Sequence, residues 1–145
     1  MRSDISVLVT GTDGFLGKNI IARLNKMGIN STTYTRKNCI QDLPDLIKKS
    51  DFIIHLAGEN RPLDEKDFDI VNAQLTASIC KAARTLGRKI SIIFASSVQA
   101  NHANAYGKSK LKAEIILQKF EADTGNSVYI SVSYTHLTLP TILLV

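Results

Sequence analysis

The 145-residue sequence contains only two cysteines and no long apolar segment. Cys39 and Cys80 lie far apart, with neither C-x-x-C spacing nor a neighbouring histidine, which predicts two free thiols. No apolar run approaches the roughly 20 residues that span a bilayer, and the N-terminus lacks the apolar block of a signal peptide. We therefore expect a cytoplasmic protein that has no membrane partner.

A cluster of metal ligands and a basic tract are absent as well. His55, His102 and His136 form no ligand set, and the apolar run around His55 predicts a hydrogen-bonded core position. The formal net charge of +5 is spread along the chain, without a basic run or interleaved aromatic residues. These patterns predict no metal site and no nucleic-acid partner. The net charge is the one feature that supports the alternative, a nucleic-acid-binding protein.

Apolar strands alternate with amphipathic helices along the sequence. Hydrophobic residues make up 44% of the chain and charged residues 21%, which are ordinary values for one globular domain. Short apolar or β-branched runs predict five strands, at residues 5–9, 31–35, 52–56, 90–95 and from 127 onward. Helical periodicity lies between them, at residues 20–27, 43–49, 67–86 and 106–123. This alternation predicts an α/β fold, a doubly wound parallel sheet with helices on both faces.

Three glycines connect the first expected strand to the first expected helix. Gly11, Gly14 and Gly17 form a G-x-x-G-x-x-G loop in the strand–loop–helix context of a dinucleotide fingerprint, one residue longer than the commonest form. The first glycine permits a tight turn, the second lets backbone N–H groups approach a pyrophosphate, and the third lets helix and strand pack closely. The positive end of the helix dipole favours the same anion. A simple turn is the alternative interpretation.

The end of the second expected strand bears on the choice of cofactor. An acidic residue there would hold a ribose 2′-hydroxyl, and an arginine would hold a 2′-phosphate. The strand runs into Tyr34-Thr35-Arg36-Lys37, which contains no carboxylate, and the forked donors of Arg36 suit a phosphate. The sequence therefore favours NADPH over NADH, unless Arg36 and Lys37 are ordinary loop charges.

Tyr106 and Lys110 set a phenol and an ammonium four residues apart at the start of an expected helix, so both share one helix face. A nearby lysine cation stabilises a phenolate and lowers the pKa of tyrosine from its usual value of ~10. The pair is therefore candidate acid/base equipment. On spacing alone, the alternative is a solvated helix turn.

Four motifs in this order resemble the extended short-chain dehydrogenase/reductase family, also called the NAD-dependent epimerase/dehydratase family. They are the glycine loop, His55-Leu-Ala-Gly58, a strand that ends in Ser96-Ser97, and Tyr106-x-x-x-Lys110. The resemblance covers about residues 4–130 and implies a Rossmann-type NAD(P)-binding domain. The third strand of the usual six is missing from this sequence, so the implied order of the five strands is 2-1-3-4-5.

The same resemblance implies roles for individual residues. Tyr106 would be the general acid, Lys110 would lower its pKa and hold the nicotinamide ribose, and Ser97, in preference to Ser96, would bind the reacting carbonyl. The residues implied to bind the cofactor are Gly11, Asp13, Gly14, Phe15, Leu16, Gly17, Arg36, Leu56, Ala57, Gly58, Asn72, Tyr106 and Lys110.

A narrower resemblance indicates a substrate class. Residues 55–62, 96–100 and 104–111 are similar to capsular polysaccharide enzymes that reduce UDP-linked 4-keto-6-deoxy-N-acetylhexosamines with NADPH. Val98 and Gln99 stand where a sugar 4,6-dehydratase would have an Asp-Glu pair, which argues against dehydration. The resemblance implies an NADPH-dependent reductase of a nucleotide sugar that forms a homodimer. An NAD-dependent 4-epimerase and a non-catalytic dinucleotide-binding sensor are the alternatives.

The C-terminal segment departs from the pattern of this family. Residues 132–141, Val-Ser-Tyr-Thr-His-Leu-Thr-Leu-Pro-Thr, resemble the translation of a transposase sequencing adapter. This resemblance predicts a Rossmann domain at residues 1–130, a non-native tail at residues 131–145 and the absence of the C-terminal substrate domain. Because that domain contributes most nucleotide-sugar contacts in the family, the fragment itself is expected to be inactive.

Overall fold

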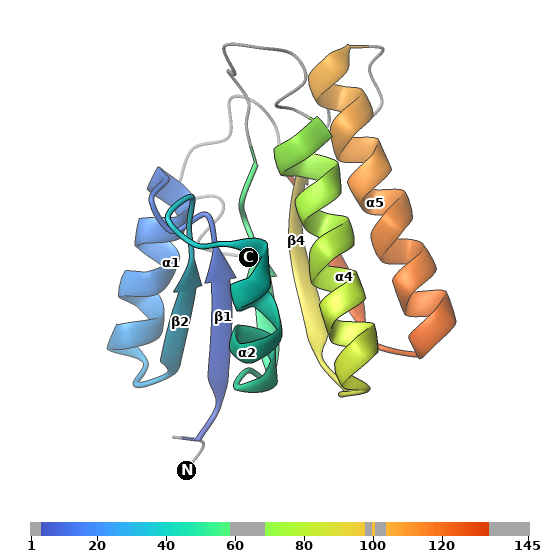
Figure 1. The fold of residues 1–145 in the computed structure, drawn as a ribbon. Coiled ribbons are helices and arrows are strands. Elements are labelled where there is room, and N and C mark those ends of the chain that lie inside the picture. Colours follow the sequence, from blue (N-terminus) through green and yellow to red (C-terminus); the bar gives the residue numbers. More distant parts are fainter. Residues whose placement is uncertain (1–3, 59–68, 98–99, 101–103, 134–145) are drawn as a thin grey trace.

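The computed structural model of the chain describes residues 4–58, 69–97, 100 and 104–133. Five strands pair in parallel in the order β2-β1-β3-β4-β5 (Figure 1). Their bounds are Ser6–Thr10 for β1, Asn30–Tyr34 for β2, Phe52–His55 for β3, Ser91–Ser97 for β4 and Val128–Ser133 for β5. The predicted fold class and strand order are confirmed.

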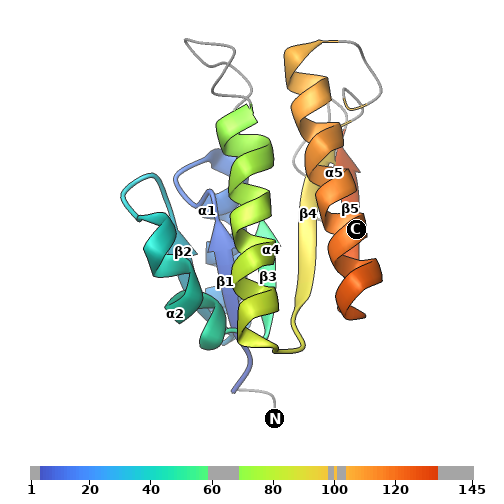
Figure 2. The ribbon, with the colours of Figure 1, turned by 45° about the vertical axis from the view of Figure 1, so that its right-hand side comes forward.

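In the described part of the chain, four α-helices and two shorter helical segments connect the strands. They are α1 (Phe15–Lys26), the 3₁₀ helix η1 (Ile40–Asp42), α2 (Leu43–Lys48), the π-helical segment η2 (Asp69–Gln74), α4 (Leu75–Leu86) and α5 (Ala105–Thr124). Helices α4 and α5 lie side by side (Figure 2). The sequence predicts one uninterrupted helix across residues 67–86, whereas the described part of that segment begins with the wider π-helical turns of η2.

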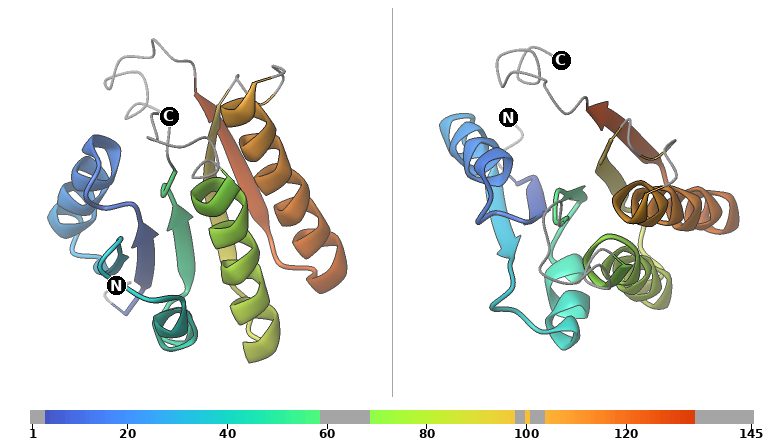
Figure 3. Two further views of the ribbon diagram at one scale, coloured as in Figure 1. Left: turned by 45° about the horizontal axis from the view of Figure 1, so that its top comes forward. Right: turned by 90° about the horizontal axis from the view of Figure 1, so that it is seen from above.

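The two faces of the sheet carry different amounts of helix. Helix α1 lies on one face, and α2, α4 and α5 lie on the other (Figure 3). Successive residues of a strand point to opposite faces. Leu8 therefore joins the larger core, with Ile53, Ile92 and Phe94, while Val7 and Val9 join the smaller core under α1.

The face covered by α1 is only partly filled. Val7 pairs in register with Phe52, and Ile93 with Tyr129, so these side chains belong to the same face. Phe52 is 37% exposed and Tyr129 is 59% exposed. Within the described residues, helices cover both faces as expected, but no described helix covers this face of β4 and β5.

Strand β5 continues past the predicted end of the domain at residue 130. Ser131, Val132 and Ser133 pair with Ala95, Ser96 and Ser97 of β4. The rest of the predicted non-native tail, residues 134–145, lies outside the described residues. Among the helices that the structure describes, none has both the length and the apolar character needed to cross a bilayer.

Candidate active site

A cleft of about 970 Å³ opens at the carboxyl ends of the parallel strands. This edge of a parallel sheet is where dinucleotides bind in doubly wound folds. The residues predicted from the sequence that line the cleft are Gly11, Asp13, Gly14, Phe15, Leu16, Gly17, Arg36, Leu56, Ala57, Gly58, Tyr106 and Lys110. Asn72 and Ser97, which were also predicted, are buried and do not line it.

Two of the three loop positions require glycine because other backbone atoms lie too close to leave room for a side chain. Gly11 has a φ of 76°, and a Cβ atom added to it would lie 2.7 Å from the backbone nitrogen of Ala57 at the end of β3. A Cβ atom added to Gly17 would lie 2.6 Å from the Cα atom of Thr12. Both distances are far below van der Waals contact, so these glycines let the loop pack against β3 and α1 against the loop.

Gly14 differs from the other two glycines because an added Cβ atom would meet only the carbonyl oxygen of Gly11, at 3.6 Å. Gly14 is the N-cap of α1, which has no side-chain capping bond and no acidic residue in its first turn. Helix N-termini of this kind present N–H groups and partial positive charge to an anion. The geometry therefore fits the predicted approach of a pyrophosphate at Gly14.

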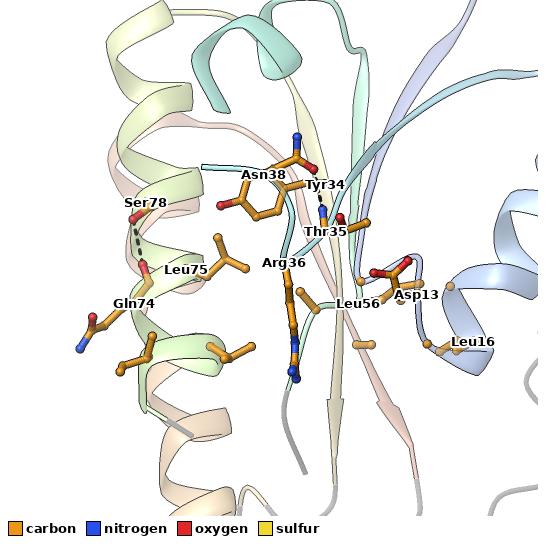
Figure 4. A pocket seen from close by; sticks show the side chains of 18 of the residues that line it. Asp13, Leu16, Tyr34, Thr35, Arg36, Asn38, Leu56, Gln74, Leu75 and Ser78 are labelled. Carbon is orange, nitrogen blue, oxygen red and sulfur yellow. Dashed lines mark hydrogen bonds between the residues drawn. The ribbon is translucent and has the colours of Figure 1, made fainter. Parts of the chain in front are cut away.

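The turn after β2 supplies the side wall of the cleft. Tyr34, Thr35, Arg36 and Asn38 line it, and Arg36 extends its side chain into the cleft (Figure 4). The backbone N–H of Gly11 donates to the carbonyl oxygen of Tyr34 at 3.0 Å, which ties this turn to the glycine loop. A guanidinium is thus positioned on the same wall as the β2 terminus, where the 2′-substituent of a ribose is expected.

His55 is fully buried in a chain of hydrogen bonds that runs from β1 through β3 to α4. Its Nδ1 lies 2.7 Å from Oγ1 of Thr10 and its Nε2 lies 2.8 Å from Oγ1 of Thr76. Thr76 donates its own hydroxyl to the carbonyl oxygen of Asn72, so it accepts from Nε2–H of His55. Burial lowers the pKa of His55 to about 3, with a smaller contribution from Lys110. The imidazole is therefore neutral, as its predicted core position requires.

Asn72 continues this chain towards the catalytic candidates. Its Nδ2 donates to Oγ of Ser109 at 2.9 Å, and Ser109 donates to the carbonyl oxygen of Tyr106 at 2.7 Å. A Cβ atom added to Gly58 would lie 2.9 Å from both Oδ1 of Asn72 and Nζ of Lys110. Asn72 therefore lies behind the residues that line the cleft, where its hydrogen bond to Ser109 connects η2 with the first turn of α5.

Tyr106 and Ser97 meet although they come from different elements. Asn104 caps α5 by accepting from the backbone N–H of Gly107 at 2.7 Å, which places Tyr106 in the first turn of the helix. The side chains of Tyr106 and Ser97 share a hydrogen bond. Burial raises the pKa of Tyr106 above its usual value, and the bond to Ser97 opposes this effect.

Lys110 lies under the phenol of Tyr106 and is 5% exposed. Its Nζ donates to the carbonyl oxygen of Ala95 at 3.0 Å and lies 5.9 Å from the centre of the Tyr106 ring. Desolvation lowers the pKa of Lys110 to about 8, and the charge of Glu114 acts in the opposite direction. The ammonium is therefore still mostly protonated at neutral pH.

The role that the family resemblance implies for Lys110 beside Tyr106 stays a prediction. Burial raises the pKa of Tyr106, and the hydrogen bond to Ser97 acts in the opposite direction. The ammonium of Lys110 is bonded to the carbonyl oxygen of Ala95 and lies near the tyrosine ring. The shared helix face is as expected.

Ser96 and Ser97 have different surroundings because neighbouring residues of a strand point in opposite directions. Ser96 lines the cleft, but its hydroxyl donates to Oε1 of Glu114 on α5. Ser97 is instead bonded to Tyr106. The serine preferred from the resemblance is thus the one that contacts the candidate acid, and its catalytic role stays a prediction.

Fold and site together define a dinucleotide-binding domain of the Rossmann type whose cleft ends at a tyrosine, a lysine and a nearby serine. The chain belongs to the NAD dependent epimerase/dehydratase family, whose model matches residues 7–141. Membership of this family implies that the domain binds NAD(P).

Individual relatives narrow the comparison. Over 127 residues the chain is 46% identical to the UDP-2-acetamido-2,6-beta-L-arabino-hexul-4-ose reductase of Pseudomonas aeruginosa, a match that covers 87% of this chain and 34% of that protein. The crystal structure of the capsular polysaccharide assembling protein CapF from Staphylococcus aureus is 35% identical, with a TM-score of 0.72, and the match covers 86% of this chain and 34% of CapF. The chain thus spans about a third of the length of these two relatives.

A more distant structure shares the fold alone. UDP-glucuronic acid 4-epimerase from Bacillus cereus, in complex with NAD, is 18% identical and has a TM-score of 0.80; the match covers 90% of this chain and 56% of that one.

Sequence reasoning missed several residues that shape the site. Asn38, Gln74 and Ser78 line the cleft, and Glu114 holds the hydroxyl of Ser96. Glu114 could have been found from its spacing, since it follows Lys110 by one helical turn. Asn38 carried no such signal, because its bonds depend on the local turn. Among the described residues, no group of three histidine, cysteine or acidic side chains could hold a metal ion.

Proposed function

We propose that this chain is the NADPH-binding part of a reductase of a nucleotide-linked 4-keto-6-deoxy sugar in surface polysaccharide biosynthesis. The observation that carries the reaction type is the hydrogen bond between Ser97 and Tyr106 beside the buried Lys110. The 46% identity to a UDP-hexulose reductase supports the substrate class. A phenol positioned at a dinucleotide cleft can protonate an alkoxide as it forms.

Each of the three side chains has a distinct proposed role. When bound, NADPH supplies the hydride that reduces the keto carbon. Tyr106 donates its phenolic proton to the oxygen of that carbon, and Ser97 holds the same oxygen by a hydrogen bond, which stabilises the developing negative charge. Lys110, whose pKa of about 8 leaves it mainly charged at neutral pH, stabilises the phenolate that remains and holds the ribose.

The preference for NADPH over NADH rests on Arg36. Its guanidinium extends into the cleft from the end of β2. A guanidinium makes charge-assisted, forked hydrogen bonds to a phosphate, and NADH offers only a ribose hydroxyl at that position. We therefore propose that replacing Arg36 by alanine reduces the affinity for NADPH much more than the affinity for NADH.

The nucleotide sugar is proposed to bind mainly through the rest of the parent protein. This chain spans 34% of the related reductase, and its described cleft is accounted for by a dinucleotide. Residues 131–145 are proposed to be a non-native segment, despite the pairing of residues 131–133 with β4. Genomic sequence downstream of the codon for Ile130 tests this, and uninterrupted agreement with residues 131–145 would refute it.

Helix α5 offers a surface for the homodimer that the family resemblance implies. Leu111 is 41% exposed and Ile115 is 55% exposed on this helix, one turn apart. We propose that two copies of the parent protein associate through α5. Sedimentation of the parent protein and of its Ile115→Glu variant tests this, since the variant should dissociate.

The reductase assignment is tested in a full-length parent protein that contains this domain. The substrate is a UDP-linked 4-keto-6-deoxy-N-acetylhexosamine, and the readout is the loss of NADPH absorbance. Replacing Tyr106 by phenylalanine removes the proton donor but keeps the ring, so turnover should fall by about 10²- to 10⁴-fold while NADPH affinity changes little. Unchanged turnover would overturn the assignment, and reduction with NADH alone would overturn the cofactor choice.

A further inference from the structure

Asn38 closes the turn that carries Arg36. Its Oδ1 accepts from the backbone N–H of Thr35 at 2.9 Å, a bond drawn in Figure 4, and its own N–H donates to the carbonyl oxygen of Thr35 at 2.9 Å. Lys37 adds a third bond, from its N–H to Oγ1 of Thr35 at 3.3 Å. Arg36 is therefore held in a turn whose two ends are joined by the side chain and the backbone of Asn38.

The same amide also holds a carboxylate. Nδ2 of Asn38 donates to Oδ2 of Asp42 at 3.3 Å, and the backbone N–H of Cys39 donates to the same oxygen at 2.9 Å. Asp42 lies close enough to the end of β2 to raise the pKa of Tyr34, although burial of Tyr34 contributes more. The sequence indicates no carboxylate at this strand end, but the fold brings one there from η1.

Asp42 nevertheless does not line the cleft, whereas Asn38 and Arg36 do. A free carboxylate at the end of β2 would bind the ribose 2′-hydroxyl of NADH and repel the 2′-phosphate of NADPH. Held by Asn38 and Cys39, the carboxylate instead caps the first turn of η1. The side chain of Asn38 therefore restrains both Arg36 and Asp42, the two charged groups here that could contact the 2′-substituent of the cofactor.

We infer that Asn38 is a specificity-determining residue, which favours the 2′-phosphorylated cofactor by fixing the turn around Arg36 and by retaining Asp42 at the start of η1. The inference rests on the proposed binding of NADPH and adds a second residue to that preference. Asn38 acts by positioning, so its effect should depend on Arg36 and should differ between the two cofactors.

A double-mutant cycle in the 145-residue chain tests this dependence. NADPH and NADH are titrated separately, and binding is followed by the fluorescence of the reduced nicotinamide, which no tryptophan of this chain can perturb. Asn38→Ala should reduce the affinity for NADPH by roughly tenfold and the affinity for NADH by less than about twofold. The first value corresponds to the loss of one charge-assisted contact. In the Arg36→Ala background, Asn38→Ala should weaken NADPH no further, because coupled residues are not additive.

Asn38→Asp separates the two parts of the role. Aspartate keeps an acceptor for the N–H of Thr35 but faces Asp42 with a like charge. It should therefore reduce the ratio of NADPH to NADH affinity even where the turn is kept and the thermal midpoint is unchanged. A ratio of NADPH to NADH affinity equal to that of the wild type would show that Asp42 has no part in the cofactor preference.

Asn126→Ala is the matched control. This asparagine also joins two backbone groups, since its Oδ1 accepts from the N–H of Ile90 at 3.4 Å and its Nδ2 donates to the carbonyl oxygen of Arg88 at 3.3 Å, but it lies at the opposite end of the sheet. It should lower the thermal midpoint and leave the affinity ratio unchanged.

The outcomes distinguish this inference from the proposed function. Equal weakening of both cofactors by Asn38→Ala, or additivity with Arg36→Ala, would overturn the inference alone. A wild-type chain that binds neither cofactor, or that prefers NADH, would overturn the proposed NADPH-binding function together with the inference.

Discussion

The hydroxyl of Ser97 is hydrogen-bonded to the phenol of Tyr106, although one ends β4 and the other begins α5. The bond lowers the pKa of Tyr106 against the larger, opposite effect of burial. Ser96, one residue earlier, is turned away and donates to Glu114. The alternation of side chains along β4 therefore separates a serine that touches the candidate acid from a serine that ties the strand to α5.

Ser97→Ala and Ser96→Ala should have different effects on turnover in the full-length parent. Loss of the Ser97 hydroxyl should reduce turnover by about 10²- to 10³-fold, the range seen when one oxyanion donor is removed. It should also raise the pKa of Tyr106, so the alkaline limit of the pH–rate profile should move to higher pH. Ser96→Ala should keep turnover within about threefold of the wild type, since it breaks only the tie to Glu114. The reverse ranking would assign the catalytic hydroxyl to Ser96.

Gly17→Ala and Gly14→Ala should separate folding from cofactor binding. A methyl group on Gly17 would collide with backbone atoms of the loop, and overpacking of this kind costs about 1–3 kcal/mol of unfolding free energy. A methyl group on Gly14 meets no close atom, and its φ of −79° suits alanine, so stability should be nearly unchanged. NADPH affinity should nevertheless fall by roughly tenfold, because the methyl group occupies the space for the pyrophosphate.

Urea titrations measure the first effect and NADPH titrations the second. A Gly14→Ala variant that binds NADPH as well as the wild type would place the pyrophosphate elsewhere.

The parallel sheet and the position of the cleft follow from local patterns, whereas the strand order was implied by the family resemblance. Ile5 to Val9 forms a short apolar run, Gly11 begins the loop directly after it, and Arg36 follows the next strand. The carboxyl ends of parallel strands meet at one edge, so residues placed after each strand converge there without further information. Together with the family resemblance, this convergence predicts about half of the residues that line the cleft.

The details of the site depend on tertiary contacts that no local pattern encodes. Lys110 shares a helix face with Tyr106, yet its ammonium is directed to Ala95, which lies on another element. Asp42 reaches the end of β2 only because η1 folds back and Asn38 holds it there. The π-helical start at Asp69 likewise replaces α-helix where the sequence shows ordinary helical periodicity.

His55 makes the chain less stable in acid, and His55→Gln should remove that effect. The folded-state pKa is about 3, below the ordinary value of 6.5, so the unfolded chain binds more protons between these values. The contribution is absent at neutral pH and grows as pH falls from 6.5 towards 3. Between pH 7 and pH 5 the wild type should lose about 2 kcal/mol more unfolding free energy than the variant. Urea titrations measure the unfolding free energy of both proteins at the two pH values. An equal loss in the wild type and in the variant would show that protonation of His55 does not destabilise the folded chain.

Lys110 gives a pH dependence of the same sign in a more alkaline range, because burial disfavours its charged form as well. The folded-state pKa is about 8 and the ordinary value is 10.5, so between these values the unfolded chain again binds more protons than the folded chain. The cost of burying the ammonium is complete below pH 8 and is relieved as pH rises towards 10.5. Lys110→Met removes this cost but also leaves the carbonyl oxygen of Ala95 without its donor, so the sign of its effect at one pH is not diagnostic.

The change with pH is diagnostic, since the lost hydrogen bond contributes a constant offset. From pH 7 to pH 10 the unfolding free energy of the wild type should rise by about 2 kcal/mol relative to Lys110→Met. Lys112→Met, which removes an ammonium that is 62% exposed on the same helix, controls for the loss of one positive charge. Urea unfolding of the three proteins at four pH values measures the slopes. A difference between wild type and Lys110→Met that stays constant from pH 7 to pH 10 would mean that Lys110 is not desolvated in the folded chain. The phenolate of Tyr106 would then lack the buried cation proposed to stabilise it.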